Sequence, residues 1–145
     1  MIKAITILIM DAEKNSCEEM QEFLQREGFI VVPANSAEEG KLVLQRMQVD
    51  ILILDLWLPD ANGLELLKEY KSFYPKLEVI IISGYGDMDA VIQAMRLNAL
   101  DFLKKPLRQM DLLAAIQRSQ IVRNNCGTYL LSNETDPLSS FLSPN

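Results

Sequence analysis

The architecture of this chain can be read from residues 50–63, whose sequence is DILILDLWLPDANG. Four consecutive apolar residues, Ile51 to Leu54, lack the in-out alternation of a strand that is wet on one face. Such a run is typical of a parallel strand that helices cover on both faces. It ends at a single carboxylate, Asp55, and Pro59 and Asn62-Gly63 then predict a loop. An aspartate here can also be a simple turn former, so its role depends on the rest of the chain.

Strand and helix patterns alternate along the chain. Short apolar strands are predicted at Ile5–Met10, Phe29–Val32, Ile51–Leu54, Leu77–Ile82 and Asp101–Lys104. An amphipathic helix is predicted after each strand, with typical start and stop residues. The predicted caps are Asn15 or Ser16, Ser36 with Glu39, and Asp87, and the predicted left-handed stops are Gly28 and Asn98.

Five strand-helix units in strict alternation predict an α/β fold with a doubly wound five-stranded parallel sheet. The strand order that brings the polar strand ends together is 2-1-3-4-5, that of a flavodoxin-like (βα)5 fold. Residues 1–123 are expected to form this one domain. Ser, Asn, Thr, Pro and Gly dominate residues 124–145, which predicts a C-terminal tail that is flexible or docked through a few apolar side chains.

Composition excludes several classes of function. The chain has 14 Lys plus Arg against 20 Asp plus Glu, a net charge of −6, which disfavours direct nucleic-acid binding. Two distant cysteines, Cys17 and Cys126, favour a reduced, cytoplasmic protein without a disulfide framework. We identify no membrane span or signal peptide. The absence of histidine excludes catalytic triads, histidine metal ligands and a phosphohistidine on these 145 residues.

Polar side chains follow four of the predicted strands. They are Asp11, Asp55, Ser83 and Lys105. In the predicted strand order they converge at one edge of the sheet. Two carboxylates, a hydroxyl and an ammonium suit a Mg²⁺ ion together with a phosphoryl group. Asp55 would be the nucleophile that forms an acyl phosphate, while Ser83 and Lys105 would each contact a phosphoryl oxygen. Taken singly, each residue is more often a cap, a turn or a solvated charge, but their joint placement favours a site.

With these residues in place, the chain resembles a response-regulator receiver domain, the phosphorylatable module of two-component signalling. The resemblance covers roughly residues 3–122. Its most specific parts are residues 51–63, the segment SGYGD at 83–87 and the segment NALDFLKKP at 98–106.

The resemblance implies roles for individual residues. Asp55 would be the phosphoacceptor, and Lys105 would precede Pro106 through a cis peptide. Ser83 and Phe102 would be the switch residues. The metal ligands would be Asp11, Asp55 and the backbone carbonyl of Trp57. The implied output surface comprises Asp87–Asn98, Asp101–Lys104 and Leu107–Val122.

One position departs from the family pattern. Receivers usually carry two adjacent acids after the first strand, of which the second binds Mg²⁺ directly, whereas this chain has Asp11-Ala12. Glu13, one place later, is a further candidate ligand. We therefore predict that Mg²⁺ binding is weak.

The function that follows is a phosphorelay switch that accepts a phosphoryl group from a histidine kinase or phosphotransfer protein. Such a protein is not an enzyme beyond catalysing its own phosphorylation and dephosphorylation. A downstream protein would bind the surface spanning Asp87–Val122, and a homodimer is a further option. The alternative is a pseudo-receiver that binds proteins without phosphorylation. Two enzyme classes are excluded. Phosphatases of the haloacid dehalogenase type carry an Asp-x-Asp motif, and this chain has Trp57 in place of the second Asp. A dinucleotide site would need a glycine-rich loop after the first strand, which this chain lacks.

Overall fold

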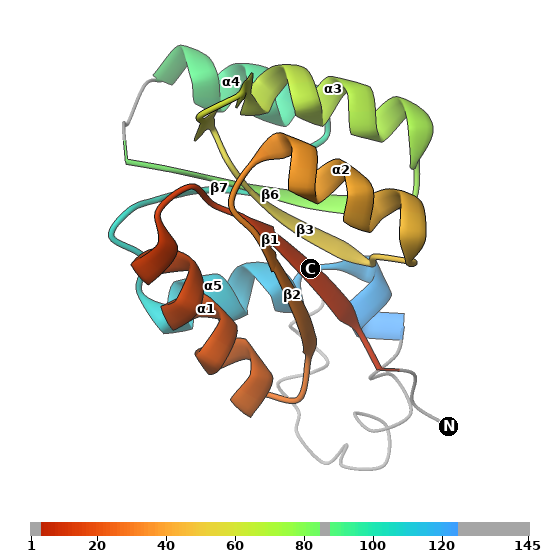
Figure 1. The fold of residues 1–145 in the computed structure, drawn as a ribbon, viewed down its shortest axis with the longest axis vertical. Coiled ribbons are helices and arrows are strands. Elements are labelled where there is room, and N and C mark those ends of the chain that lie inside the picture. The colour runs from red at the N-terminus through yellow and green to blue at the C-terminus, as the bar shows by residue number, and fades with distance from the viewer. Residues whose placement is uncertain (1–3, 85–87, 125–145) are drawn as a thin grey trace, which may run out of the picture.

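A five-stranded parallel sheet runs through the centre of the molecule (Figure 1). The computed structural model describes residues 4–84 and 88–124. The strands of the sheet are β1 (Thr6–Met10), β2 (Ile30–Ala34), β3 (Ile51–Asp55), β6 (Glu78–Ser83) and β7 (Asp101–Lys104). Their spatial order is β2-β1-β3-β6-β7, and all neighbours are parallel. This confirms the predicted order 2-1-3-4-5, in which the fourth and fifth strands are β6 and β7.

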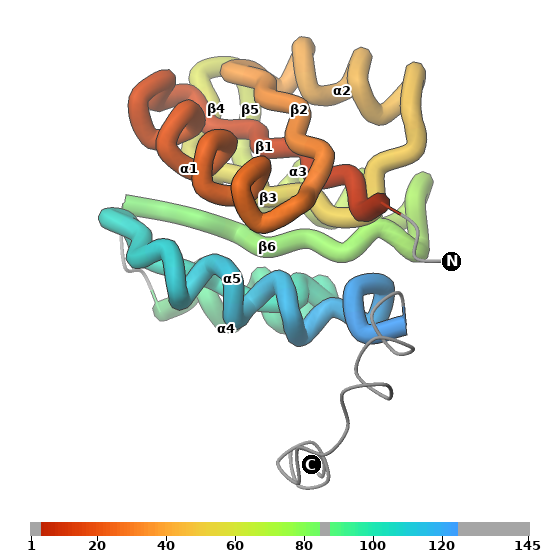
Figure 2. Tube along the Cα trace, turned by 90° about the horizontal axis from the view of Figure 1, so that it is seen from below, coloured from red at the N-terminus to blue at the C-terminus, as the bar shows by residue number. Residues whose placement is uncertain are grey.

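Helices cover both faces of the sheet. They are α1 (Lys14–Arg26), α2 (Ala37–Arg46), α3 (Gly63–Phe73), α4 (Met88–Arg96) and α5 (Gln109–Gln117). In Figure 1, α2, α3 and α4 lie above the sheet and α1 and α5 below it. Figure 2 looks from the side of α1 and α5, with α1 over the β1–β2 side of the sheet and α5 alongside β6. The doubly wound architecture is confirmed.

Alternate residues of the central strand belong to two separate hydrophobic clusters. Leu52 and Leu54 face α2, α3 and α4, whereas Ile51 and Ile53 face α1 and α5. All four side chains are fully buried. Burial of one such side chain contributes about 1.5–3 kcal/mol to stability. The unbroken apolar run therefore reflects a strand that is dry on both faces, as predicted.

The segment after Asp55 differs from the plain loop that Pro59 and Asn62-Gly63 predicted. Two short strands, β4 (Trp57–Leu58) and β5 (Ala61–Asn62), pair antiparallel and form a hairpin. Backbone N–H and C=O groups near the core need partners, and the hairpin supplies them within this connection.

Helix α1 begins earlier than predicted. Asn15 and Ser16 lie inside the helix, and the N-cap residue is Glu13, whose side chain makes no capping hydrogen bond. The cause is Asp11, whose Oδ1 accepts a hydrogen bond of 3.0 Å from the backbone N–H of Glu13. The chain therefore turns directly after β1, and the N–H of Cys17 already bonds the carbonyl of Glu13.

Other predicted helix ends agree with the structure. Gly28 and Asn98 both have positive φ, at 97° and 67°. Ser36 caps α2 by accepting a hydrogen bond from the N–H of Glu39. The predicted cap Asp87 lies outside the described residues, as does the predicted tail from residue 125 onward. Within the described segments, no helix is both long enough and apolar enough to cross a bilayer.

Candidate functional site

The carboxyl ends of β1, β3, β6 and β7 meet at one edge of the sheet. Asp11 follows β1 directly, while Asp55 and Ser83 are the last residues of β3 and β6. Lys105 follows β7, and its N–H bonds the carbonyl of Ser83 at 2.7 Å. All of these residues except Lys105 are buried.

The Lys105 ammonium joins the two carboxylates. Its Nζ lies 2.9 Å from Asp11 Oδ1 and 3.1 Å from Asp55 Oδ2. The side chain of Lys105 is only 14% exposed, so these charge-assisted bonds are shielded from water. Glu13 Oε1 is more distant at 3.7 Å, and its side chain is 65% exposed. The structure thus brings together Asp11, Asp55 and Lys105, with Glu13 at the rim.

Backbone groups also hold the carboxylates in place. Asp55 Oδ1 accepts a hydrogen bond of 3.1 Å from the N–H of Trp57, while Asp11 Oδ1 accepts one from the N–H of Glu13. The second oxygen of Asp11, Oδ2, is buried without a hydrogen-bond partner among the described residues. A buried, unpartnered carboxylate oxygen is an acceptor that a bound cation can satisfy.

The two carboxylates differ in acidity. Burial raises the pKa of Asp55, and its contact with Asp11 raises it further. Burial also acts to raise the pKa of Asp11, but the hydrogen bonds with Lys105, with Asp55 and with the Glu13 N–H outweigh it, and the pKa of Asp11 is lowered. Burial acts to lower the pKa of Lys105, but its bonds with Asp11 and Asp55 leave the pKa raised. Lys105 therefore stays a cation at neutral pH.

The donors at this edge fit a hard cation that keeps several waters. Asp11 and Asp55 provide buried carboxylate oxygens, of which Asp11 Oδ2 has no hydrogen-bond partner among the described residues. Within residues 4–84 and 88–124, no three acidic, cysteine or histidine side chains are grouped as a complete metal site. Two carboxylates are a donor set that fits Mg²⁺, which is usually bound by one or two carboxylates with water and phosphate oxygens in its other positions.

The remaining predicted residues occupy distinct places. Ser83 is fully buried at the end of β6, next to the β3 strand that carries Asp55. Phe102 lies on the edge strand β7, is half-buried, and packs against the cluster beneath α2, α3 and α4. The peptide bond between Lys105 and Pro106 is cis.

Two polar residues that sequence reasoning did not single out contact the frame of the site. The Asn35 side-chain amide donates a hydrogen bond of 2.9 Å to the backbone carbonyl of Asp11. The Asp60 carboxylate accepts hydrogen bonds from the backbone N–H groups of Ala37 and Glu38. The sequence carries no spacing signal for either contact. In both cases a side chain bonds a backbone atom more than 20 residues away along the chain.

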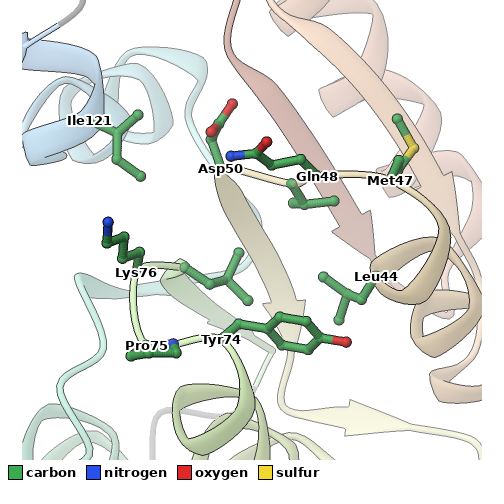
Figure 3. A pocket seen from close by; sticks show the side chains of 10 residues that line it. Leu44, Met47, Gln48, Asp50, Tyr74, Pro75, Lys76 and Ile121 are labelled. Atoms are coloured by element: carbon green, nitrogen blue, oxygen red, sulfur yellow. The ribbon is translucent and has the colours of Figure 1, made fainter.

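An apolar pocket lies at the opposite edge of the sheet (Figure 3). It is lined by the end of α2, the segment after α3 and the region before β3, including Leu44, Met47, Tyr74 and Asp50. Asp50 precedes the first residue of β3, whereas Asp55 is its last. The pocket is therefore separate from the site formed by Asp11, Asp55 and Lys105.

Comparisons with known proteins agree on one family. The family model described as the response regulator receiver domain matches residues 7–117. The DNA-binding transcriptional regulator NtrC of Proteus hauseri is 33% identical over 113 residues, which are 78% of this chain and 24% of that protein. A CheY-like receiver domain from Methanospirillum hungatei JF-1 matches with a TM-score of 0.76 at 27% identity, covering 80% of this chain and 93% of that one.

A further solved structure is the beryllofluoride-activated NtrC4 receiver domain dimer. It matches with a TM-score of 0.75 at 26% identity and covers 79% of this chain and 94% of that one. The chain spans about a quarter of the length of the curated relatives it matches.

Proposed function

This chain belongs to the response regulator receiver domain family, and we propose that Asp55 accepts a phosphoryl group as the switch of a two-component system. Receiver domains are signalling modules and not classical enzymes. The observation that carries the proposal is the Lys105 ammonium, which lies within 3.1 Å of the Asp55 carboxylate in a shielded site. An ammonium in this place can pair with a phosphoryl oxygen on the acyl phosphate.

The phosphoryl donor is a phosphohistidine on a histidine kinase or phosphotransfer protein. It must lie outside these 145 residues, which contain no histidine. An Asp55 carboxylate oxygen attacks phosphorus, the new O–P bond forms, and the N–P bond to the donor imidazole breaks. Hydrolysis later returns the Asp55 carboxylate and releases phosphate, so the chain catalyses only its own phosphorylation and dephosphorylation.

Two side chains assist this transfer. Lys105 offsets the charge of the phosphoryl oxygens, and its raised pKa keeps it protonated. The Ser83 hydroxyl donates a hydrogen bond to a phosphoryl oxygen, which moves the end of β6 and with it Phe102 on the neighbouring strand β7. Strands β6 and β7 pair side by side, with Ile81 opposite Phe102 and Ser83 opposite Lys104.

Asp11, Asp55 and the Trp57 carbonyl would hold Mg²⁺, with Glu13 as a further ligand. When bound, Mg²⁺ neutralises charge on the phosphoryl oxygens. Because Ala12 stands where the family usually has a second acid, we expect weak binding.

The partners follow from the exposed surfaces. Met88, Ile92 and Met95 are 68%, 42% and 45% exposed on α4, within the proposed output surface Asp87–Val122. A downstream protein would bind there, or a second copy of the chain. The dimer of the NtrC4 receiver domain supports the second option. We place the protein in the cytoplasm and assign it no direct contact with nucleic acid.

A pseudo-receiver is the second candidate function, and Ala12 is the observation that favours it. Such a protein would keep the fold and bind partners without phosphorylation. The two candidates differ in Mg²⁺ binding, which titration of the single tryptophan, Trp57, would detect by fluorescence. The titration should be repeated with beryllofluoride, which occupies the position of the phosphoryl group.

The decisive test of phosphorylation is intact-mass measurement after incubation with a small phosphodonor and Mg²⁺. We expect the wild type to gain one phosphoryl group and Asp55→Asn to gain none. Asp111→Asn, an exposed aspartate on α5, is the matched control and should behave as the wild type. Equal phosphorylation of Asp55→Asn would rule out Asp55 as the acceptor.

A further inference from the structure

The segment at the N-terminus of α2 is bonded both to Asp11 and to the loop that follows Asp55. Two side chains make these contacts, Asn35 just before the helix and Asp60 from the turn of the β4–β5 hairpin. Neither belongs to the donors described above.

Asp60 binds the first turn of α2 from outside the helix. Its Oδ1 lies 2.8 Å from the N–H of Ala37, and its Oδ2 lies 3.0 Å from the N–H of Glu38. The first N–H groups of a helix lack intrahelical partners and carry partial positive charge, so a carboxylate is well suited to them. The hydrogen bond from the Ala37 N–H is the main cause that lowers the pKa of Asp60, and the group stays an anion.

This contact ties down the segment that presents the Trp57 carbonyl. The base of this segment is already held, because the N–H of Gly63 donates a hydrogen bond of 2.7 Å to the carbonyl of Leu56. A Cβ on Gly63 would lie 2.7 Å from the backbone oxygen of Asp55, which shows how closely the start of α3 meets the end of β3. Asp60 fixes the tip of the hairpin, and loop 56–63 is thereby anchored at its base and at its tip.

Asn35 ties the same helix end to Asp11. Its side-chain amide bonds the Asp11 carbonyl, while the Asp11 N–H bonds the carbonyl of Ala34 at 3.0 Å. Helix α2 also touches the residue before Asp11, since a Cβ on Gly40 would overlap Sδ of Met10. Both peptide groups of Asp11 are thus held by the segment that leads into α2.

We propose that Asn35 and Asp60 are positioning residues that use the N-terminus of α2 to set the distance between Asp11 and loop 56–63. The N-terminus of α2 is bonded to Asp60 in loop 56–63, and Asn35, which leads into α2, is bonded to the backbone of Asp11. The consequence of this inference rests on the proposed function. The distance between Asp11 and loop 56–63 determines how well Mg²⁺ and the phosphoryl group are bound.

The test compares full-length variants by two readouts. Asp60→Ala removes both bonds to α2, and Asp60→Asn keeps an acceptor for one of them. Ser36→Ala is the control for helix stability, because it removes a cap from the same end of α2 without touching the hairpin. Glu65→Gln is the control for charge, because it removes one exposed carboxylate from the first turn of α3.

The first readout is hydrogen exchange of the Trp57 amide in metal-free protein, since this N–H bonds Asp55 Oδ1 only while the loop is in place. The second is the affinity for Mg²⁺ by Trp57 fluorescence. We expect Asp60→Ala to exchange faster at Trp57 and to bind Mg²⁺ about tenfold more weakly, as is usual when a partner of a metal ligand is lost. Asp60→Asn should fall between Asp60→Ala and the wild type.

Both controls should retain the wild-type values at Trp57, even though Ser36→Ala lowers the melting temperature. Unchanged Trp57 exchange in Asp60→Ala would overturn the proposal, as would an equal effect of Ser36→Ala. The proposed function fails separately, if the wild type binds no Mg²⁺ or gains no phosphoryl group. Faster Trp57 exchange in Asp60→Ala would then still support the positioning role.

Discussion

At the scale of single residues, two buried carboxylates share one ammonium. Asp11 and Asp55 both contact Lys105, yet the pKa of Asp11 is lowered and that of Asp55 is raised. Asp55 thus bears the cost of burying a second anion beside the first. A neutral side chain at position 55 should relieve this cost.

We therefore expect Asp55→Asn to stabilise the metal-free protein at neutral pH by about 1 kcal/mol, the usual size of a single-site effect. A raised folded-state pKa gives stability that is present below the ordinary value of 3.8 and lost as pH rises through the folded pKa. The advantage of Asp55→Asn should accordingly shrink as the pH falls toward 3.8, as measured by urea unfolding at a series of pH values.

Asp11→Asn is the matched variant, and we expect it to change the free energy of unfolding in the opposite direction. The lowered pKa of Asp11 gives stability that is present above 3.8 and lost as pH falls through the folded pKa. Asp11→Asn should therefore destabilise the protein at neutral pH. If both variants changed stability in the same direction, the assignment of the two acidities would be wrong.

The second prediction at this scale concerns the exposed residue Ala12. Mg²⁺ affinity depends on the number of anionic ligands. Ala12→Asp should tighten Mg²⁺ binding about tenfold, which is about 1.4 kcal/mol. It should also lower the stability of the metal-free protein, because a further anion joins Asp11 and Asp55. Trp57 fluorescence titration and thermal unfolding without metal would measure the two effects.

Unchanged affinity in Ala12→Asp would contradict this prediction and leave two explanations. Either Glu13 already serves as the ligand or Mg²⁺ does not bind at this edge. Glu13→Gln separates them, because only in the first case does it weaken binding.

At the scale of elements, the junction between β3 and α3 leaves no room for a side chain. A Cβ on Gly63 would lie 2.7 Å from both the Asp55 oxygen and the Leu56 Cα, which are backbone atoms that cannot rotate away. Gly63→Ala should therefore destabilise the protein by about 1–3 kcal/mol, as overpacking usually does. Urea unfolding would measure the loss.

Gly84→Ala is the control for Gly63→Ala, because a Cβ on Gly84 would have no atom within 4 Å. It should cost little stability. A similar loss in both variants would show that backbone freedom and not the close contact explains the glycine at position 63.

At the scale of the whole molecule, the sheet is closed on both faces by the described helices. The buried cluster beneath α1 and α5 extends to Val122. Deletion of residues 125–145 should therefore lower the free energy of unfolding by about 1 kcal/mol or less, a shift of a few degrees in the melting temperature. Calorimetry of both forms would test this. A much larger loss would mean that Leu130, Leu131, Phe141 or Leu142 packs on the domain.

Local patterns in the amino-acid sequence were sufficient to predict the architecture. Runs such as Ile51 to Leu54 and stops such as Gly28 and Asn98 report local burial and local backbone conformation, which depend on neighbouring residues along the chain. Strict alternation of strands and helices then leaves few possible topologies. The same reasoning placed Asp11, Asp55, Ser83 and Lys105 at one edge, because the ends of parallel strands share an edge.

The connections between these residues, in contrast, are visible only in the folded chain. The bridge from Lys105 to both carboxylates and the bonds of Asn35 and Asp60 join side chains to groups 22 to 94 residues away. Asn35 and Asp60 bind backbone atoms, whose positions leave no trace in residue type or spacing. The β4–β5 hairpin and the early start of α1 were missed for the same reason, since each follows from backbone groups that found partners in the folded chain.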